Sequence, residues 1–252
     1  MSIFDTPEFN QRLFFPRPDT SPPPAGAEDL FIDVAPGVRV HARRHPAPKA
    51  TRAELLLFHG NGEVVADYDD VVPSFARLGV QVTVFDFRGY GASTGTPTLR
   101  TALLDGVACV NAVPRVTGRP RVLFGRSLGA AVAAELAGQQ PPLIDALVLE
   151  SGGSDLERLL SRRGLREVRL TDAERATFDP RPKLARCRVP ALVLHGDDDT
   201  LIEPVEARGS LAALGSPRKQ LVLVPGRGHN DVSFAPEYWA ALDEFLARLG
   251  EE

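Results

Sequence analysis

Apolar residues in this chain gather in short runs, and longer stretches with a helical pattern separate the runs. Short runs of this kind are typical of strands buried on both faces of a sheet. The strands predicted in this way cover residues 55–58, 80–85, 122–124, 146–149, 191–194 and 221–224. Helices are predicted over residues 64–78, 99–113, 128–137, 204–214 and 236–249. Such alternation predicts a mostly parallel sheet with helices on both faces.

The chain before the first run has a different pattern. Residues 30–34 and 38–42 alternate apolar and polar positions around Ala35-Pro36-Gly37, which predicts a β-hairpin. Together with the six later strands, this gives an α/β fold with about eight strands.

Two segments lie outside this alternation. Residues 1–28 form an N-terminal extension, and its apolar residues are expected to pin it to the protein body, with a lid or membrane-touching role as the alternative. These apolar residues are Phe4, Phe9, Leu13, Phe14 and Phe15. Residues 153–189 hold ten basic and six acidic side chains and are too long for a simple crossover. We therefore predict a single domain over 29–252, with 153–189 as a cap insertion.

The pentapeptide 125–129, Gly-Arg-Ser-Leu-Gly, joins a predicted strand to a predicted helix. Glycines two residues before and after Ser127 let strand and helix pass closely, and the helix N-terminus would face the serine hydroxyl. This pattern favours a nucleophilic serine. The alternative is an ordinary turn with a capping serine.

A serine nucleophile needs a base and an acid, and the carboxyl ends of later strands supply candidates. His229 lies in a glycine-flanked loop after the last strand, where a base could reach over the sheet edge, although a lone loop histidine is often merely exposed. The strand at 191–194 leads into Asp197, Asp198 and Asp199, and spacing alone does not choose among them. The triplet could also be a solvated turn or a weak cation site.

An oxyanion site is predicted at the end of the strand 55–58. There the sequence reads His59-Gly60-Asn61-Gly62, and the Asn61 N–H together with the Leu128 N–H would provide two donors. A plain glycine-rich turn is the alternative. His59 itself is expected to be structural, with its imidazole bonded to the loop backbone.

Arg126 precedes the candidate nucleophile and is expected to point beneath the turn. A buried cation needs a partner, and Glu150 or Asp86 could supply the carboxylate.

Together these motifs resemble the α/β-hydrolase superfamily. The loop 86–93, Asp-Phe-Arg-Gly-Tyr-Gly-Ala-Ser, also resembles a loop of that family, and the resemblance covers about residues 29–250. It implies that Ser127 is the nucleophile, His229 the general base and Asp199 the acid, with Asp197 or Asp198 as lesser candidates. Asn61 and Leu128 would then form the oxyanion hole. The Gly-Arg-Ser-Leu-Gly and His-Asn-Asp segments resemble the small α/β-hydrolase domain-containing proteins, several of which are esterases, thioesterases or depalmitoylases.

The predicted function is therefore that of a serine hydrolase that cleaves small-molecule carboxylic esters or thioesters through an acyl-serine. The same acyl-enzyme could serve an acyltransferase, and a peptidase or a non-catalytic binding module are further alternatives. No metal or organic cofactor is required, and the serine argues against reactions that use an aspartate nucleophile.

Composition narrows the remaining classes. The net charge of −4 gives no support for a nucleic-acid binder. No apolar run reaches the roughly 18 residues of a membrane helix, and the charged N-terminus does not resemble a secretory signal. The two cysteines lack metal or redox spacing and are expected to be buried thiols, which favours a cytoplasmic location. Oligomeric state is left open.

Overall fold

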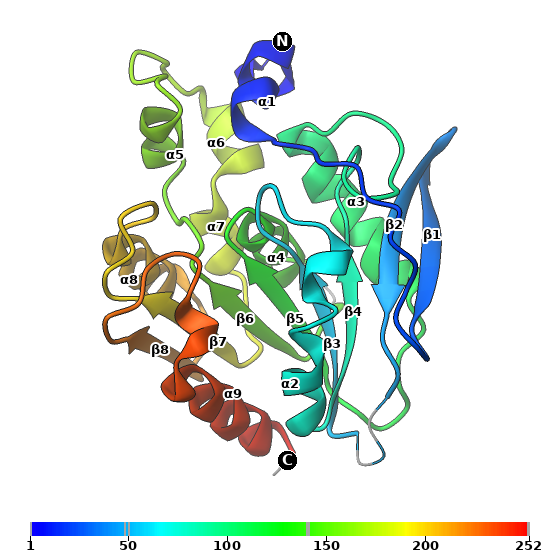
Figure 1. Cartoon of the computed structure of the whole chain (residues 1–252). Helices are drawn as coiled ribbons and strands as arrows, with labels where there is room; N and C mark the ends of the chain where they lie inside the picture. The colour runs from blue at the N-terminus through cyan, green and yellow to red at the C-terminus, as the bar shows by residue number, and fades with distance from the viewer. Residues whose placement is uncertain (1, 48, 50, 140–141, 251–252) are drawn as a thin grey trace.

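An eight-stranded sheet lies at the centre of the described part of the chain (Figure 1). The computed structural model describes residues 2–47, 49, 51–139 and 142–250. The strands are β1 (Glu28–Ala35), β2 (Val38–Arg44), β3 (Ala53–Phe58), β4 (Val80–Phe85), β5 (Arg121–Arg126), β6 (Ala146–Glu150), β7 (Ala191–Gly196) and β8 (Lys219–Val224). Their order is β1-β2-β4-β3-β5-β6-β7-β8. Strand β2 pairs antiparallel with β1 and with β4, and all other neighbouring strands pair parallel, so the predicted hairpin and mostly parallel sheet are confirmed.

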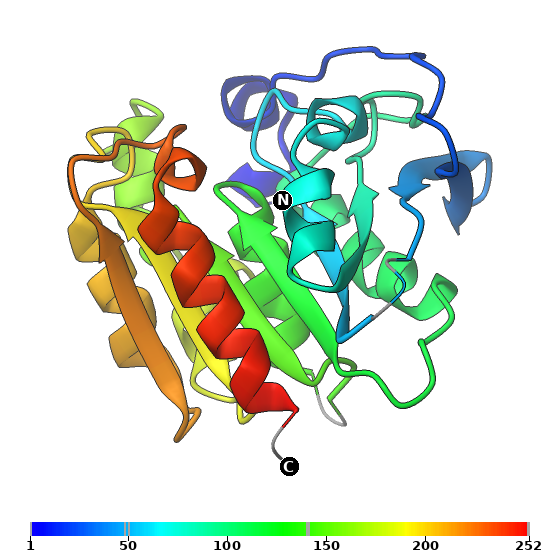
Figure 2. The same cartoon turned by 60° about the horizontal axis from the view of Figure 1, so that its bottom comes forward.

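Helices cover both faces of the sheet. The helices that lie against the sheet in this way are α2 (Val72–Arg77), α3 (Leu99–Ala112), α4 (Gly129–Ala137), α8 (Pro204–Ala213) and α9 (Pro236–Leu249). Alternate residues of each buried strand point to opposite faces, so Leu56 and Phe58 pack in the same core as α3 and α4, while Leu55 and Leu57 pack with α2 and α9. Figure 2 shows α9 (red) lying across its face of the sheet. The two apolar layers fix the position of the sheet, and the candidate site lies at one edge of that sheet.

The prediction of a single helix over residues 64–78 is wrong. The segment forms a short 3₁₀ turn, η2 (Val65–Tyr68), followed by the separate helix α2. Pro73 lies in the first turn of α2, and a proline has no N–H to continue a helix from the preceding turn. The periodic pattern did not reveal this break.

The N-terminal extension contains η1 (Ile3–Asp5) and α1 (Pro7–Leu13). Four of its apolar side chains are buried as predicted: Phe4, Phe9, Leu13 and Phe14. Phe15 is 53% exposed, so its predicted burial is wrong. The Phe4 ring packs 4.4 Å from the Phe178 ring, centroid to centroid, at the end of α6 (Asp172–Phe178). The boundary at residue 28 stays a prediction.

The segment 153–189 contains α5 (Leu156–Arg162), α6 and α7 (Pro180–Leu184). In Figure 1, α5 and α6 lie near α1 at the top of the molecule, while α7 packs against α4 in the body. The Asp155 carboxylate begins α5 by accepting hydrogen bonds from the N–H groups of Glu157 and Arg158. A cap formed by the whole segment stays a prediction.

Candidate active site

Ser127 occupies the turn between β5 and α4. Its φ of 50° lies in the left-handed region, which is unfavourable for any residue with a side chain. The turn is tight because a Cβ on Gly129 would lie 2.0 Å from the Phe58 carbonyl oxygen, and one on Gly125 would lie 2.6 Å from the Ala133 Cβ. The two flanking glycines therefore permit the close approach that the sequence predicted.

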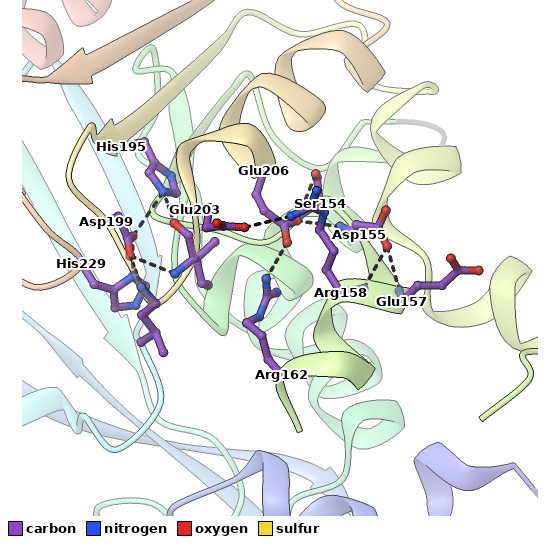
Figure 3. A network of polar contacts seen from close by, with 12 residues as sticks. Ser154, Asp155, Glu157, Arg158, Arg162, His195, Asp199, Glu203, Glu206 and His229 are labelled. Carbon is purple, nitrogen blue, oxygen red and sulfur yellow. Dashed lines mark hydrogen bonds and ion pairs between the residues drawn. The ribbon is translucent and has the colours of Figure 1, made fainter. Parts of the chain in front are cut away.

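The side chains of Ser127, His229 and Asp199 form a chain of hydrogen bonds. The Ser127 Oγ lies 3.0 Å from the His229 Nε2, and the His229 Nδ1 lies 2.7 Å from the Asp199 Oδ2. Figure 3 shows His229 pointing toward Asp199. The structure thus brings together three residues that are far apart in the sequence, each of them following a different strand.

Asp199 is 2% exposed, while Asp197 and Asp198 are exposed. Its Oδ1 accepts hydrogen bonds of 2.9 Å from the N–H groups of Leu201 and Ile202. His195 was not predicted to take part, yet its Nε2 lies 3.2 Å from the Asp199 Oδ2. Burial disfavours the charged carboxylate, but the hydrogen bonds from His195, His229 and Ile202 hold the pKa of Asp199 below its usual value.

Asn61 and Leu128, the predicted oxyanion donors, both line the cavity at Ser127. Neither backbone N–H donates a hydrogen bond within the described residues, so both are available to a ligand. The Glu63 carboxylate holds the loop by accepting a 2.7 Å bond from the Gly60 N–H. The His59 Nδ1 lies 2.7 Å from the Gly60 carbonyl oxygen, which confirms the structural role predicted for His59.

The side chain of Asn61 ties the loop after β3 to the N-terminal extension. The Tyr90 hydroxyl donates to the Asn61 Oδ1 at 2.6 Å, and the Phe15 N–H lies 3.0 Å from the same oxygen. The Asn61 Nδ2 donates to the Leu13 carbonyl oxygen at 2.6 Å. These contacts fix the position of the Asn61 backbone, and no local sequence pattern predicts them.

Arg126 links three loops of the site. Its guanidinium lies 3.0 Å from Glu150 and 2.6 Å from Glu63, and it donates to the Asn230 side chain at 3.0 Å. Burial disfavours the cation, but the two carboxylates keep the pKa of Arg126 above its usual value. The predicted pairing with Glu150 is confirmed. The alternative, Asp86, is wrong because that carboxylate contacts His41 at 2.8 Å and His59 at 3.1 Å.

Comparisons with known proteins support the family resemblance that the motifs predict. A family model described as serine aminopeptidase, S33, matches residues 49–171. The uncharacterized protein Rv2307c of Mycobacterium tuberculosis is 31% identical over 82% of this chain and 74% of its own length. The alpha/beta hydrolase domain-containing protein WAV2 of Arabidopsis thaliana is 27% identical over 89% of this chain and 80% of its own length. This chain belongs to the α/β-hydrolase superfamily.

Solved structures agree on the fold of this α/β hydrolase. The Pyrococcus furiosus esterase Pf2001 aligns with a TM-score of 0.74 at 21% identity, covering 92% of this chain and 98% of that one. Est1E from Butyrivibrio proteoclasticus aligns with a TM-score of 0.69 at 17% identity, covering 89% and 99%. At these identities the likeness shows the fold, while the family match supports a hydrolase.

A cavity of about 510 Å³ opens above Ser127 and His229 of this hydrolase. Much of its lining is apolar and comes from the N-terminal extension, α5, the end of α6 and the loop after β7. These residues include Leu13, Phe15, Leu156, Leu159, Phe178 and Ile202. The volume is within the range of small-molecule sites, and the apolar walls suit a hydrocarbon portion of a ligand.

Three further observations concern the cysteines, the metal-ligating side chains and the length of the helices. Cys109 and Cys187 are buried free thiols, as predicted. Among the described residues, no group of three or more histidines, cysteines and acidic residues could hold a metal ion. The described helices include none that is both long enough and apolar enough to cross a membrane.

Replacing Tyr90 with phenylalanine is expected to lower kcat about tenfold and to change KM less. The change removes the hydroxyl that donates to Asn61, while the ring keeps its place in the core. Steady-state kinetics with a p-nitrophenyl ester would measure this effect. An Asn61→Ala variant should give a similar loss, and the double variant little more. A loss of thermal stability with kcat unchanged would contradict a positioning role.

Proposed function

We propose that this α/β hydrolase is a serine hydrolase that cleaves carboxylic esters or thioesters through an acyl-serine intermediate. The observation that carries the proposal is the hydrogen-bond chain from Ser127 through His229 to Asp199. It ends at a serine held in a strained turn and lining a largely apolar cavity.

Each step of the reaction has a residue suited to it. The His229 Nε2 accepts the hydroxyl proton as the Ser127 Oγ bonds to the acyl carbon, and the carbonyl electron pair moves to oxygen. The N–H groups of Asn61 and Leu128 donate to that oxyanion. The intermediate then collapses, and the departing alcohol or thiol takes the proton from His229. Water attacks the acyl-serine by the same route and releases the acid.

Asp199 would act on His229 rather than on the substrate. As an ionised carboxylate it accepts a hydrogen bond from the Nδ1–H group, fixes the ring orientation and offsets the positive charge that His229 gains. Its low pKa keeps this charge in place throughout the neutral range.

The description of the matching family raises an aminopeptidase as the second candidate. An aminopeptidase needs an anionic group to hold the α-ammonium group of its substrate. The two acidic side chains in the described lining are both paired, Glu63 with Arg126 at 2.6 Å and Asp155 with Arg181 at 3.3 Å. The cavity therefore favours an ester or thioester over a peptide N-terminus.

A fluorophosphonate probe is expected to label the wild-type protein at Ser127 and to leave Ser127→Ala unlabelled. Ser151 is a matched control because it too has a left-handed backbone, with φ of 48°, but its buried hydroxyl has no partner in the described structure. Ser151→Ala should be labelled like the wild type, as read by mass spectrometry of the labelled peptide. Equal labelling of Ser127→Ala, or none of the wild type, would refute the nucleophile assignment.

Substrate screening distinguishes the related activities. We expect the protein to hydrolyse p-nitrophenyl esters and a matched thioester. We expect it not to cleave aminoacyl p-nitroanilides. Product analysis with an added alcohol or amine acceptor would reveal an acyltransferase, because the acceptor would then carry the acyl group.

A further inference from the structure

Arg163 lines the same cavity as Ser127 and His229 but has no carboxylate partner among the described residues. Its Nε is buried and has no hydrogen-bond partner in the described structure. The Phe15 ring lies beside it, with its centroid 5.7 Å from the guanidinium carbon. A ring face attracts a cation but leaves its donors unsatisfied.

The other charged side chains of the described lining are compensated. Glu63 pairs with Arg126, and Asp155 pairs with Arg181. Arg162, next to Arg163 in sequence, donates to the Glu206 Oε1 at 2.6 Å. Arg163 is therefore the charged group of this lining that lacks an opposite charge.

Figure 3 shows Arg162 directed toward Glu206. Glu206 is 1% exposed, and its second oxygen accepts bonds of 2.7 Å and 3.0 Å from the N–H groups of Ser154 and Asp155. This carboxylate is fully engaged in holding the start of α5 to α8. Glu206 is thus not free to turn toward Arg163.

An unpaired arginine in a partly apolar cavity is unfavourable for the protein alone. Burial, together with the positive charge of Arg162, lowers the pKa of Arg163 from its usual value. A bound anion would supply the missing charge and the missing acceptors, and the gain would be large because water is partly excluded.

We propose that Arg163 binds a carboxylate of the substrate, so that the preferred substrates are esters or thioesters with a second, free carboxyl group. The proposal rests on the serine-hydrolase function, since it assigns the substrate class of that same site. A guanidinium matches the planar carboxylate with two parallel hydrogen bonds. A phosphate monoester, with a charge of roughly −1.5 to −2, would leave negative charge uncompensated.

The kinetic test compares half-esters of dicarboxylic acids with neutral esters of equal carbon number, such as p-nitrophenyl hydrogen adipate and p-nitrophenyl hexanoate. Chain lengths from succinate to suberate vary the distance between the ester carbonyl and the free carboxylate. At the best length, the wild type should prefer the anionic ester by about tenfold or more in kcat/KM. Arg163→Leu should lower this ratio about 10- to 100-fold, and Arg163→Lys should lower it less.

Arg166→Leu is the matched control, because Arg166 is exposed and outside the cavity lining. It removes the same charge nearby and should leave the ratio unchanged. A pair of leaving groups, 4-carboxyphenyl and 4-(methoxycarbonyl)phenyl butanoate, tests whether the carboxylate lies on the alcohol side. The inference is overturned if neither pair shows a preference, or if Arg163→Leu keeps the wild-type ratio.

A binding measurement separates this inference from the proposed reaction. In Ser127→Ala, adipate should bind about tenfold more tightly than its neutral dimethyl ester or inorganic phosphate by calorimetry, and Arg163→Leu should remove the difference. Arg163-dependent binding without any ester cleavage by the wild type would refute the reaction but not the carboxylate site. Cleavage of neutral esters without adipate binding would refute the carboxylate site alone. Tighter binding of phosphate than of adipate would overturn the carboxylate assignment.

Discussion

Replacing His229 with alanine is expected to lower kcat/KM for a p-nitrophenyl ester by about 10⁵-fold or more. The Ser127 hydroxyl lies 3.0 Å from the His229 Nε2 and would lose its proton acceptor. Ser127→Ala should cost about as much, and the double variant should cost no more, because the two groups act as one unit. Steady-state kinetics of the three variants would measure this non-additivity.

Added imidazole provides the control. It should partly restore the activity of His229→Ala, since a small base can occupy the vacated space, and should not restore Ser127→Ala. Losses that simply multiply in the double variant would contradict a shared proton transfer. A His229→Ala variant with nearly wild-type activity would mean that another group is the base.

The fold and the three residues of the hydrogen-bond chain could be predicted because parallel strands constrain them. Carboxyl ends of neighbouring parallel strands meet at one sheet edge, so residues that follow β5, β7 and β8 must lie near one another. The glycines around Ser127 and His229 added a local signal for tight loops. Among the three consecutive aspartates, however, the sequence alone could not distinguish the buried one from the two exposed ones.

Apart from the helix that breaks at Pro73, the features that the sequence did not predict depend on long-range contacts. Phe15 has the composition of a core residue, but the chain leaves α1 in a direction that places its ring on the cavity rim. Tyr90 and the extension meet at Asn61 across 29 and 46 residues of sequence. Arg163 is one of ten basic residues between 153 and 189, and no local pattern marks it as unpaired. Such features depend on tertiary packing that no short window contains.

Replacing Asp199 with asparagine is expected to lower kcat by about 10⁴-fold. The Asp199 Oδ2 accepts a 2.7 Å hydrogen bond from the His229 Nδ1–H group, which leaves the Nε2 free to accept the Ser127 proton. An asparagine amide can donate to Nδ1 instead, and would then favour the tautomer with its proton on Nε2, facing the serine. The ring would stay in place with the wrong tautomer. Pre-steady-state acylation kinetics would locate the loss in the chemical step.

Asp198→Asn is the matched control, since Asp198 is the neighbouring exposed carboxylate and should leave kcat unchanged. Stability gives a second readout with a definite sign. Because the folded protein holds the pKa of Asp199 low, this carboxylate stabilises the fold above the usual aspartate pKa of about 4, and the stabilisation is lost as pH falls below that value. The difference in free energy of unfolding between wild type and Asp199→Asn should therefore be largest near neutral pH and shrink on acidification. A difference that grew on acidification, or an equal loss of kcat in Asp198→Asn, would contradict the assignment of Asp199 as the ionised partner of His229.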